Sequence, residues 1–315
     1  LLSRQPGIVA FSKVLTESNT THKSVPMLMS DITACNFDSI YHQKGIITAF
    51  KEAGYQTAFF SNQRYNHSFI DFFGKEADTF DFIKEDSLDS AYNPSDDELL
   101  ALVAKELSKG NQKQFIVLHT YGSHFNYRER YPSEDAFFLP DYPVEAEVKY
   151  RDNLVNAYDN TIRYTDSFLS RLIHMLEEQH VDAAMLYTSD HGEDIFDDSR
   201  HLFLHASPVP SYYQLHVPFL IWMSDTYREA YPEHWQTVTG NKDKDVSSSC
   251  SFFPTMLELG GVQTSYRNDS SSVVSPLYTM KPRVYLNDHN EPRPLNDLGM
   301  KQPDFQKCQV LGIKY

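Results

Sequence analysis

The sequence predicts an α/β fold with a mostly parallel central sheet sandwiched by helices. Short apolar runs of strand-like composition alternate with amphipathic helical segments along the chain, a pattern typical of parallel strands joined by crossover helices. The chain has 315 residues, 41% of them hydrophobic, which is enough for a large core. We therefore expect residues 1–315 to form a single soluble domain.

The expected elements follow in order along the chain. An apolar run at 8–15 precedes the hydroxyl-rich stretch "TESNTTHKSVP" at 16–26. A helix at 45–54 is expected to close at Gly54, and a strand at 55–62 follows it. The next helix, at 95–110, has Ser95 as its N-cap, acidic residues in its first turn and Gly110 at its end. The remaining expected segments are a strand at 114–124, one long helix or two at 146–180, a strand and loop at 181–194, an apolar run at 217–225, a polar excursion at 239–251, a helix at 251–261 and an edge strand at 282–288.

Charge and cysteine content exclude several classes of function. The 43 acidic and 28 basic residues give a formal net charge of -15, which disfavours binding to a nucleic-acid backbone, so we expect no nucleic-acid partner. No apolar run approaches the roughly 18 residues of a membrane span. The three cysteines, Cys35, Cys250 and Cys308, are far apart and form no metal-binding motif; their disulfide state stays open, and small buried apolar residues are the favoured interpretation.

Candidate site residues gather where strands are expected to end. The segment "MLYTSDHGED" places Asp190 and His191 directly after an apolar run, and carboxylate oxygen and imidazole nitrogen are both zinc ligands. The alternative is an Asp or Ser that caps a helix, with an exposed histidine. His124 ends the strand expected at 114–124, together with His119, and His205 follows the Asp-His pair. His201 and His205 have helical spacing, but two nearby prolines make a helix doubtful, and each histidine alone fits a structural role.

The stretch at 16–26 supplies a candidate nucleophile. A threonine hydroxyl that touches a metal loses its proton more readily, and Thr21 is our candidate. Its alternative role is to cap a helix that starts near "KSVPMLMS". The two roles are compatible, because a helix N-terminus also favours the negative charge of a phosphoryl group.

Five segments, in order and spacing, resemble one family across nearly all of the chain. They are "NTTHKSVPM", "VLHTYGSH", "NAYDNTIRYTD", "YTSDHGED" and "FLHASPVP". The chain resembles the phosphoethanolamine transferases of Gram-negative envelopes, the group that includes the mobile colistin-resistance enzymes, within the alkaline-phosphatase/sulfatase-like superfamily. "SDHGE" by itself is shared with several members of that superfamily, and the threonine before "SVP" sharpens the assignment.

The resemblance implies roles for particular residues. Thr21 would be the nucleophile and a zinc ligand, and Asp190 and His191 would be further ligands of the same Zn²⁺. His124 and His205 are similar to the pair that holds the transferred phosphate or a second metal ion, and Asn62 is similar to a polar substrate contact. One zinc ion, or two, is implied.

The chain departs from the family pattern in two places. The family's remaining zinc ligand is a glutamate upstream of the threonine, and Glu17 is too close to match it. We therefore expect the first strand, with that glutamate, and an N-terminal membrane domain to be missing from these residues. Glu17 and Met27 stand where several relatives carry a disulfide pair, so the family's usual disulfide framework is absent.

The implied activity is transfer of phosphoethanolamine from phosphatidylethanolamine to lipid A or a lipopolysaccharide core sugar, through a phosphothreonine at Thr21. The implied location is the Gram-negative inner membrane, with this domain in the periplasm and a link to polymyxin resistance. A phosphodiesterase or glycerol-phosphate transferase of the same superfamily is the alternative enzyme. A sulfatase is disfavoured because "SVPML" from Ser24 lacks the arginine that such enzymes require. The alternative that is not an enzyme is a noncatalytic binding domain of the cell envelope.

Overall fold

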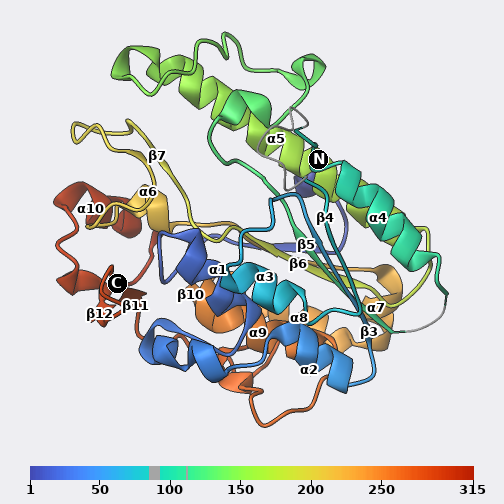
Figure 1. Cartoon of the computed structure of the whole chain (residues 1–315). Coiled ribbons are helices and arrows are strands. Elements are labelled where there is room, and N and C mark those ends of the chain that lie inside the picture. The colour runs from blue at the N-terminus through green and yellow to red at the C-terminus, as the bar shows by residue number, and fades with distance from the viewer. Residues whose placement is uncertain (85–92, 111–112) are drawn as a thin grey trace. The chain divides into compact units, whose positions relative to one another are not determined.

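The computed structural model describes residues 1–84, 93–110 and 113–315 (Figure 1). The chain folds into two compact units, each built from separate stretches of sequence. The first unit contains Leu1–Gln5, Tyr55–Gln179 and Asp194–Leu204. The second unit contains Pro6–Gly54, His180–Glu193 and His205–Tyr315. Each unit has its own sheet, and the two are described separately.

The first unit is built on a parallel sheet in the order β4-β3-β5. Its strands are β3 (Gln56–Ser61), β4 (Thr79–Phe82) and β5 (Gln114–His119), and aromatic and β-branched residues dominate their interior. The helices are α3 (Phe69–Gly74), α4 (Glu98–Leu107) and α5 (Arg151–Glu177). β7 (Asp194–Ile195) and β8 (Phe203–Leu204) pair antiparallel. The unit also has short 3₁₀ turns at Leu2–Arg4, Tyr127–Glu129, Ser133–Asp135 and Val148–Tyr150.

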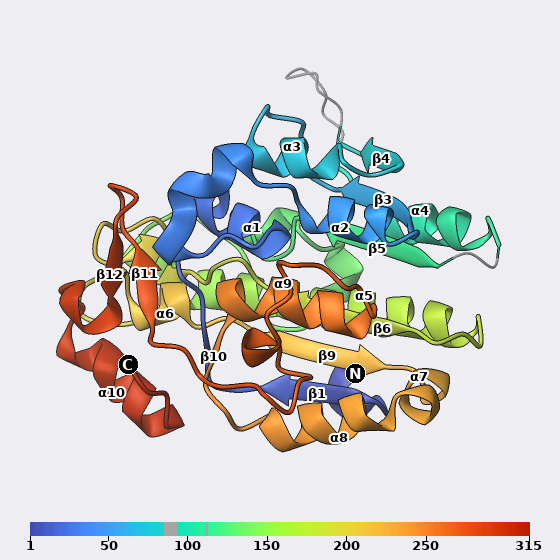
Figure 2. The same ribbon diagram turned by 90° about the horizontal axis from the view of Figure 1, so that it is seen from below.

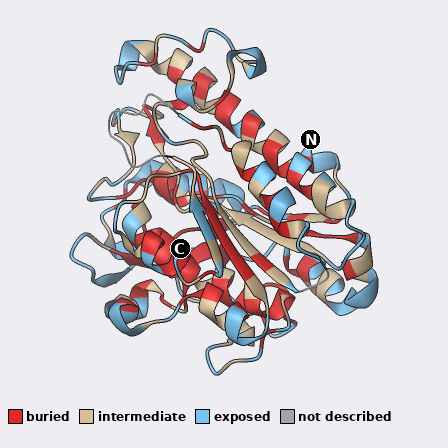
Figure 3. Cartoon of the chain, turned by 45° about the vertical axis from the view of Figure 1, so that its right-hand side comes forward, coloured by how far each residue is buried: buried red, intermediate tan, exposed pale blue. Residues whose placement is uncertain are grey.

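The long helix expected at 146–180 is a single helix, α5. Buried and exposed residues alternate along its length, as Figure 3 shows. This pattern follows from the spacing of its buried residues, which are three or four positions apart and so form one stripe. Six positions along the stripe are Leu154, Ala157, Thr161, Tyr164, Phe168 and Leu172.

The second unit is built on a sheet in the order β1-β9-β6, and β9 is antiparallel to both neighbours (Figure 2). The strands are β1 (Ile8–Phe11), β6 (Ala184–Thr188) and β9 (Phe219–Met223). Two smaller pairs are β2 (Val14–Leu15) with β10 (Val246–Ser247), and β11 (Val284–Leu286) with β12 (Pro292–Pro294). The helices are α1 (Thr21–Met29), α2 (Ile46–Glu52), α6 (Tyr212–Leu215), α7 (Asp225–Ala230), α8 (Pro232–Asn241), α9 (Ser248–Leu259) and α10 (Gln302–Leu311), with 3₁₀ turns at Ala34–His42, Asp269–Ser271 and Leu295–Asp297.

A hydrophobic core holds the sheet of the second unit to its helices. Phe219 and Ile221 of β9 are fully buried, and the rings of Phe11 and Phe219 meet edge to face at 5.7 Å. Residues of β1, α8 and α9 complete the same cluster. Because β6 is paired with β9 along its whole length, this core fixes the position at which β6 ends and its loop begins.

Several boundaries differ from the sequence prediction. The expected N-cap Ser95 is wrong: α4 begins at Glu98, because residues 95–97 form a turn in which the Glu98 amide donates to the Ser95 carbonyl. The stretch at 239–251 is not a polar excursion, since it contains the end of α8, β10 and the first turn of α9. The edge strand expected at 282–288 is confirmed as β11.

The cysteines and helices settle two further expectations. All three cysteines are free thiols. Cys308 is buried as expected, Cys250 is half-buried and Cys35 is exposed, so the prediction of buried apolar residues was wrong for Cys35.

Over residues 1–84, 93–110 and 113–315, no helix combines the length and the apolar character that a membrane crossing requires.

Candidate active site

The hydroxyl-rich stretch forms the start of α1 in the second unit. Thr20 is in an extended conformation and precedes the helix, and Thr21 is its first residue, so the expected cap lies one residue earlier than Thr21. No side-chain capping bond forms there. Thr21 and Ser24 are three residues apart and share one face of α1. The Thr21 hydroxyl is therefore available for other contacts.

The loop after β6 brings Asp190 and His191 to α1. Its shape requires glycine at position 192, because a Cβ there would lie 2.1 Å from the backbone oxygen of Tyr213. The Gly192 amide donates to the Gln214 carbonyl at 2.9 Å, and the Ser189 hydroxyl donates to the His191 carbonyl at 2.7 Å. These bonds fix the backbone conformation on both sides of His191. His191 itself is only 9% exposed.

Thr21, Asp190 and His191 converge as the sequence predicted. His191 Nε2 lies 3.0 Å from Thr21 Oγ1 and 3.4 Å from Asp190 Oδ2. The Ser24 hydroxyl is 3.5 Å from the same carboxylate oxygen. His191 Nδ1 is 3.0 Å from the Gly192 carbonyl, to which it can only donate, so Nδ1 carries the proton of the neutral ring. The Nε2 lone pair then faces the Thr21 hydroxyl.

His205 joins this group, together with a carboxylate that sequence reasoning missed. The rings of His191 and His205 lie 4.1 Å apart between centroids, with 36° between their planes. His205 Nδ1 is 3.1 Å from Glu193 Oε1, and the Glu193 side chain is only 6% exposed. Glu193 belongs to the same "SDHGED" stretch as Asp190 and His191. Its proximity to His205 depends on the path of residues 194–204, which the sequence pattern does not reveal.

His124 and Asn62 belong to the first unit. His124 is exposed, with Nδ1 2.5 Å from the Phe125 carbonyl and its ring edge-on to Tyr121. Asn62 is 1% exposed, and its Nδ2 donates to the Pro94 carbonyl at 3.1 Å and to Asp96 Oδ1 at 2.8 Å. These partners are in the first unit as well. Their assignment to substrate or phosphate binding stays a prediction.

The other two histidines of these segments, His119 and His201, belong to the first unit. His119 Nδ1 is 2.9 Å from the Ser61 hydroxyl in the first unit. His201 is exposed and has a φ of 51°, so the doubt about a helix that would carry both His201 and His205 was justified.

The donor atoms around His191 can be tested against zinc. In a tetrahedral zinc site with bonds of about 2.0 Å, neighbouring ligand atoms are about 3.3 Å apart. The separations of 3.0 Å and 3.4 Å from His191 Nε2 to the Thr21 and Asp190 oxygens match this edge length. The protonated Nδ1 leaves Nε2 free to bind metal. The three residues therefore fit zinc, although within the described part of the chain no group of three or more His, Cys, Asp or Glu side chains is arranged for a metal ion.

Glu17 does not supply a further metal-binding oxygen to this group. Its carboxylate is buried and accepts bonds from the Ala34 amide at 2.7 Å, the Ser247 hydroxyl at 3.0 Å and the Cys250 thiol at 2.8 Å. Burial raises the pKa of Glu17, while those hydrogen bonds act in the opposite direction. Glu17 thus joins α9 to the segment that begins with Ala34.

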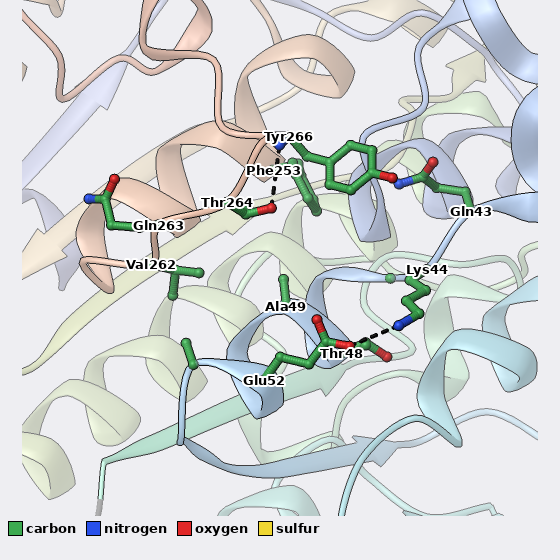
Figure 4. A pocket seen from close by; sticks show the side chains of 12 residues that line it. Gln43, Lys44, Thr48, Ala49, Glu52, Phe253, Val262, Gln263, Thr264 and Tyr266 are labelled. Atoms are coloured by element: carbon green, nitrogen blue, oxygen red, sulfur yellow. Dashed lines mark hydrogen bonds and ion pairs between the residues drawn. The ribbon is translucent and has the colours of Figure 1, made fainter.

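A separate cavity of about 330 Å³ lies between α2, α9 and the loop after α9 (Figure 4). Lys44 and Glu52 form an ion pair at 2.8 Å in its wall, and Phe253 and Tyr266 line the opposite side. The residues of the Thr21–His191 group do not line it.

Comparison with known proteins agrees with the fold and the motifs. The sequence pattern of the sulfatase family matches residues 1–262, so the chain belongs to that family.

Within this family the chain is similar to phosphoethanolamine transferases, as its motifs indicated. It is 28% identical over 278 residues to phosphoethanolamine transferase EptA of Salmonella typhimurium, covering 85% of this chain and 50% of that protein. The integral membrane protein lipooligosaccharide phosphoethanolamine transferase A (EptA) of Neisseria meningitidis matches with a TM-score of 0.78 and 26% identity, over 86% of this chain and 52% of that one.

A solved domain closer to this chain in length confirms the alkaline-phosphatase/sulfatase-like fold. The C-terminal periplasmic domain of EptC from Escherichia coli, solved in complex with Zn, has a TM-score of 0.84 and 23% identity, over 95% of this chain and 85% of that one. Most of this chain matches these curated relatives, but the chain spans only about half of their length.

Proposed function

We propose that this chain transfers phosphoethanolamine from phosphatidylethanolamine to a lipopolysaccharide acceptor, either lipid A or a core sugar, through a phosphothreonine on Thr21. The observation that carries the proposal is the 3.0 Å distance between Thr21 Oγ1 and His191 Nε2. A threonine hydroxyl is activated as a nucleophile when it lies beside a general base or binds a metal ion. The named relatives support the transferred group.

The first half-reaction forms one bond and breaks one. Thr21 Oγ1 gives up its hydroxyl proton and attacks the donor phosphorus, the bond from phosphorus to the diacylglycerol oxygen breaks, and that oxygen ends with the proton that the threonine lost. Thr21, Asp190 and His191 would hold Zn²⁺, which when bound lowers the pKa of the threonine hydroxyl and offsets phosphoryl charge. His205, whose Nδ1 lies 3.1 Å from Glu193 Oε1, would contact a phosphoryl oxygen of the donor or the leaving oxygen through its ring.

The second half-reaction restores the threonine. An oxygen of the acceptor attacks the phosphorus, the bond to Thr21 Oγ1 breaks, and the acceptor's proton returns to the threonine. His124 and Asn62 are proposed to contact the substrate. In addition, we propose a membrane location with this domain in the periplasm, by likeness to relatives described as an integral membrane protein and as a periplasmic domain.

A transfer assay tests the proposal. The longest natural protein that carries this chain is incubated with zinc, lipid A and either phosphatidylethanolamine or phosphatidylglycerol, and modified lipid A is measured by mass spectrometry. We expect product only with phosphatidylethanolamine, and none for Thr21→Ala. Thr20→Ala is the matched control, because the Thr20 hydroxyl contacts Ser18 and not the site. Normal transfer by Thr21→Ala would overturn the proposed nucleophile, and transfer only from phosphatidylglycerol would favour a glycerol-phosphate transferase.

A further inference from the structure

A buried polar network lies behind the candidate site and contacts the segments that supply its residues. Its central residue is Asn19, two positions before Thr21 and only 1% exposed. The Asn19 carbonyl accepts from the Ala206 amide at 3.2 Å, and Asn19 Nδ2 donates to the Ser207 carbonyl at 3.0 Å. These two bonds hold the segment of Thr21 against the residues that immediately follow His205.

Gln214 connects Asn19 to the loop of His191. Its Oε1 accepts the second Nδ2 proton of Asn19 at 2.6 Å, and its Nε2 donates to the Ser207 hydroxyl at 2.9 Å. Its backbone carbonyl accepts from the Gly192 amide at 2.9 Å. Gln214 is fully buried, and hydrogen bonds are electrostatically stronger in such a low-dielectric interior. One residue, Gln214, thereby connects the Thr21 segment and the His205 segment through its side chain and the His191 loop through its backbone carbonyl.

Tyr285 of β11 completes the network. Its hydroxyl donates to Asn19 Oδ1 at 2.6 Å, and its side chain is 1% exposed. Both amide protons and the side-chain oxygen of Asn19 therefore have partners, so the amide has one orientation. The Leu286 amide also donates to the Glu17 carbonyl at 2.8 Å, so β11 contacts the Thr21 segment at two points.

We propose that Asn19, Gln214 and Tyr285 are positioning residues, which set the distances between Thr21, His191 and His205 without touching the substrate. The expected effect of these residues on kcat rests on the proposed function. The physical reason is that three short segments from distant parts of the sequence meet at the site, and each alone has freedom to shift. A displacement of about 1 Å at a reacting group can lower a rate by about 10²-fold.

The sharpest test is Asn19→Asp. The aspartate oxygen at the Oδ1 position still accepts from Tyr285, and the Gln214 amide can turn to donate to the other oxygen. The bond to the Ser207 carbonyl is lost, because two acceptors then face each other. The variant thus weakens the attachment of the His205 segment, which keeps the backbone bond from the Ala206 amide to the carbonyl of residue 19. We expect kcat for transfer to fall by about 10²-fold with KM little changed.

The matched control is Asn241→Asp in the same unit. Asn241 is likewise buried, and its Nδ2 donates to the carbonyls of Val273 and Ser275 at 2.9 Å and 3.3 Å. Tyr285→Phe and Tyr278→Phe form a second pair, since the Tyr278 hydroxyl donates to the Asp245 carbonyl at 2.7 Å outside the site. Both control variants lose a comparable buried bond, and we expect kcat to stay near the wild-type value in each.

A spectroscopic readout separates this inference from the proposed function. The His191 and His205 rings are close enough to shift each other's resonances, so NMR of the labelled rings reports their separation without turnover. We expect the ring signals to move in Asn19→Asp and Tyr285→Phe and to stay in the two controls. Unmoved signals in both site variants would overturn the inference, as would equal losses of kcat in variants and controls. Moved signals in a protein that transfers nothing would uphold the positioning and reject the function.

Discussion

Two strand ends in this protein carry similar sequence signals and have different surroundings. After β6, Asp190 and His191 are fixed by the Ser189 and Gly192 bonds and meet Thr21 within 3.0 Å. After β5, His124 is exposed and bonds to the carbonyl of its own neighbour, Phe125. A strand end delivers a side chain to an edge of the sheet, but a site forms within a unit only where a second element meets it. For His191 that element is α1.

The largest expected effect contrasts these two strand ends directly. His191→Ala removes the hydrogen-bond partner of the Thr21 hydroxyl, and we expect kcat to fall by about 10³-fold. His124→Ala should cost less, because its described partners are a neighbouring carbonyl and the Tyr121 ring. The measurement is transfer kinetics of both variants side by side. An equal loss in the two would show that the strand ends contribute alike.

A smaller effect is expected at Glu193, which orients His205. Glu193→Gln keeps the shape but removes the charge beside His205 Nδ1. Partners that orient a catalytic or ligating histidine typically contribute about 10- to 100-fold, so we expect a kcat loss in that range. Glu193→Ala should lose at least as much. Unchanged kcat in both variants would remove Glu193 from the site.

The smallest expected effect concerns stability at the other end of the Thr21 segment. Burial raises the pKa of Glu17, so the folded protein holds that proton to a higher pH than the unfolded chain does. The free energy of unfolding should therefore decrease as pH rises from the ordinary carboxyl range through the raised pKa. Glu17→Gln should flatten this part of the profile, measured by urea unfolding at several pH values. The exposed Glu52→Gln is the control, and equal slopes in wild type and Glu17→Gln would contradict the assignment.

Much of the fold could be predicted because its signals are local. The stripe of buried residues in α5 and the apolar runs of β3, β5, β6 and β9 follow directly from residue spacing. The predicted start of α4 was wrong because Ser95, which resembles a helix N-cap, instead begins a turn. Capping signals in the sequence do not distinguish these two conformations. Residues 239–251 were misread because short elements in polar sequence have little periodicity.

The candidate site was predictable only in part, for a physical reason. Thr21, Asp190, His191 and His205 belong to recognisable motifs, and the structure brings all four together. Glu193 was missed because its partner lies beyond an irregular connection. Asn19, Gln214 and Tyr285 carry no sequence pattern, since buried polar networks depend on tertiary contacts between distant segments. Sequence motifs thus predicted the candidate reacting groups but not the residues that we propose to position them.

The most direct test of the account is intact-mass spectrometry of the protein after incubation with zinc and phosphatidylethanolamine in the absence of acceptor. The account predicts a phosphoethanolamine adduct that maps to Thr21 in the wild type, is absent from Thr21→Ala and disappears when lipid A is added. An adduct on any other residue, or lipid A modified without Thr21 ever carrying the group, would contradict it.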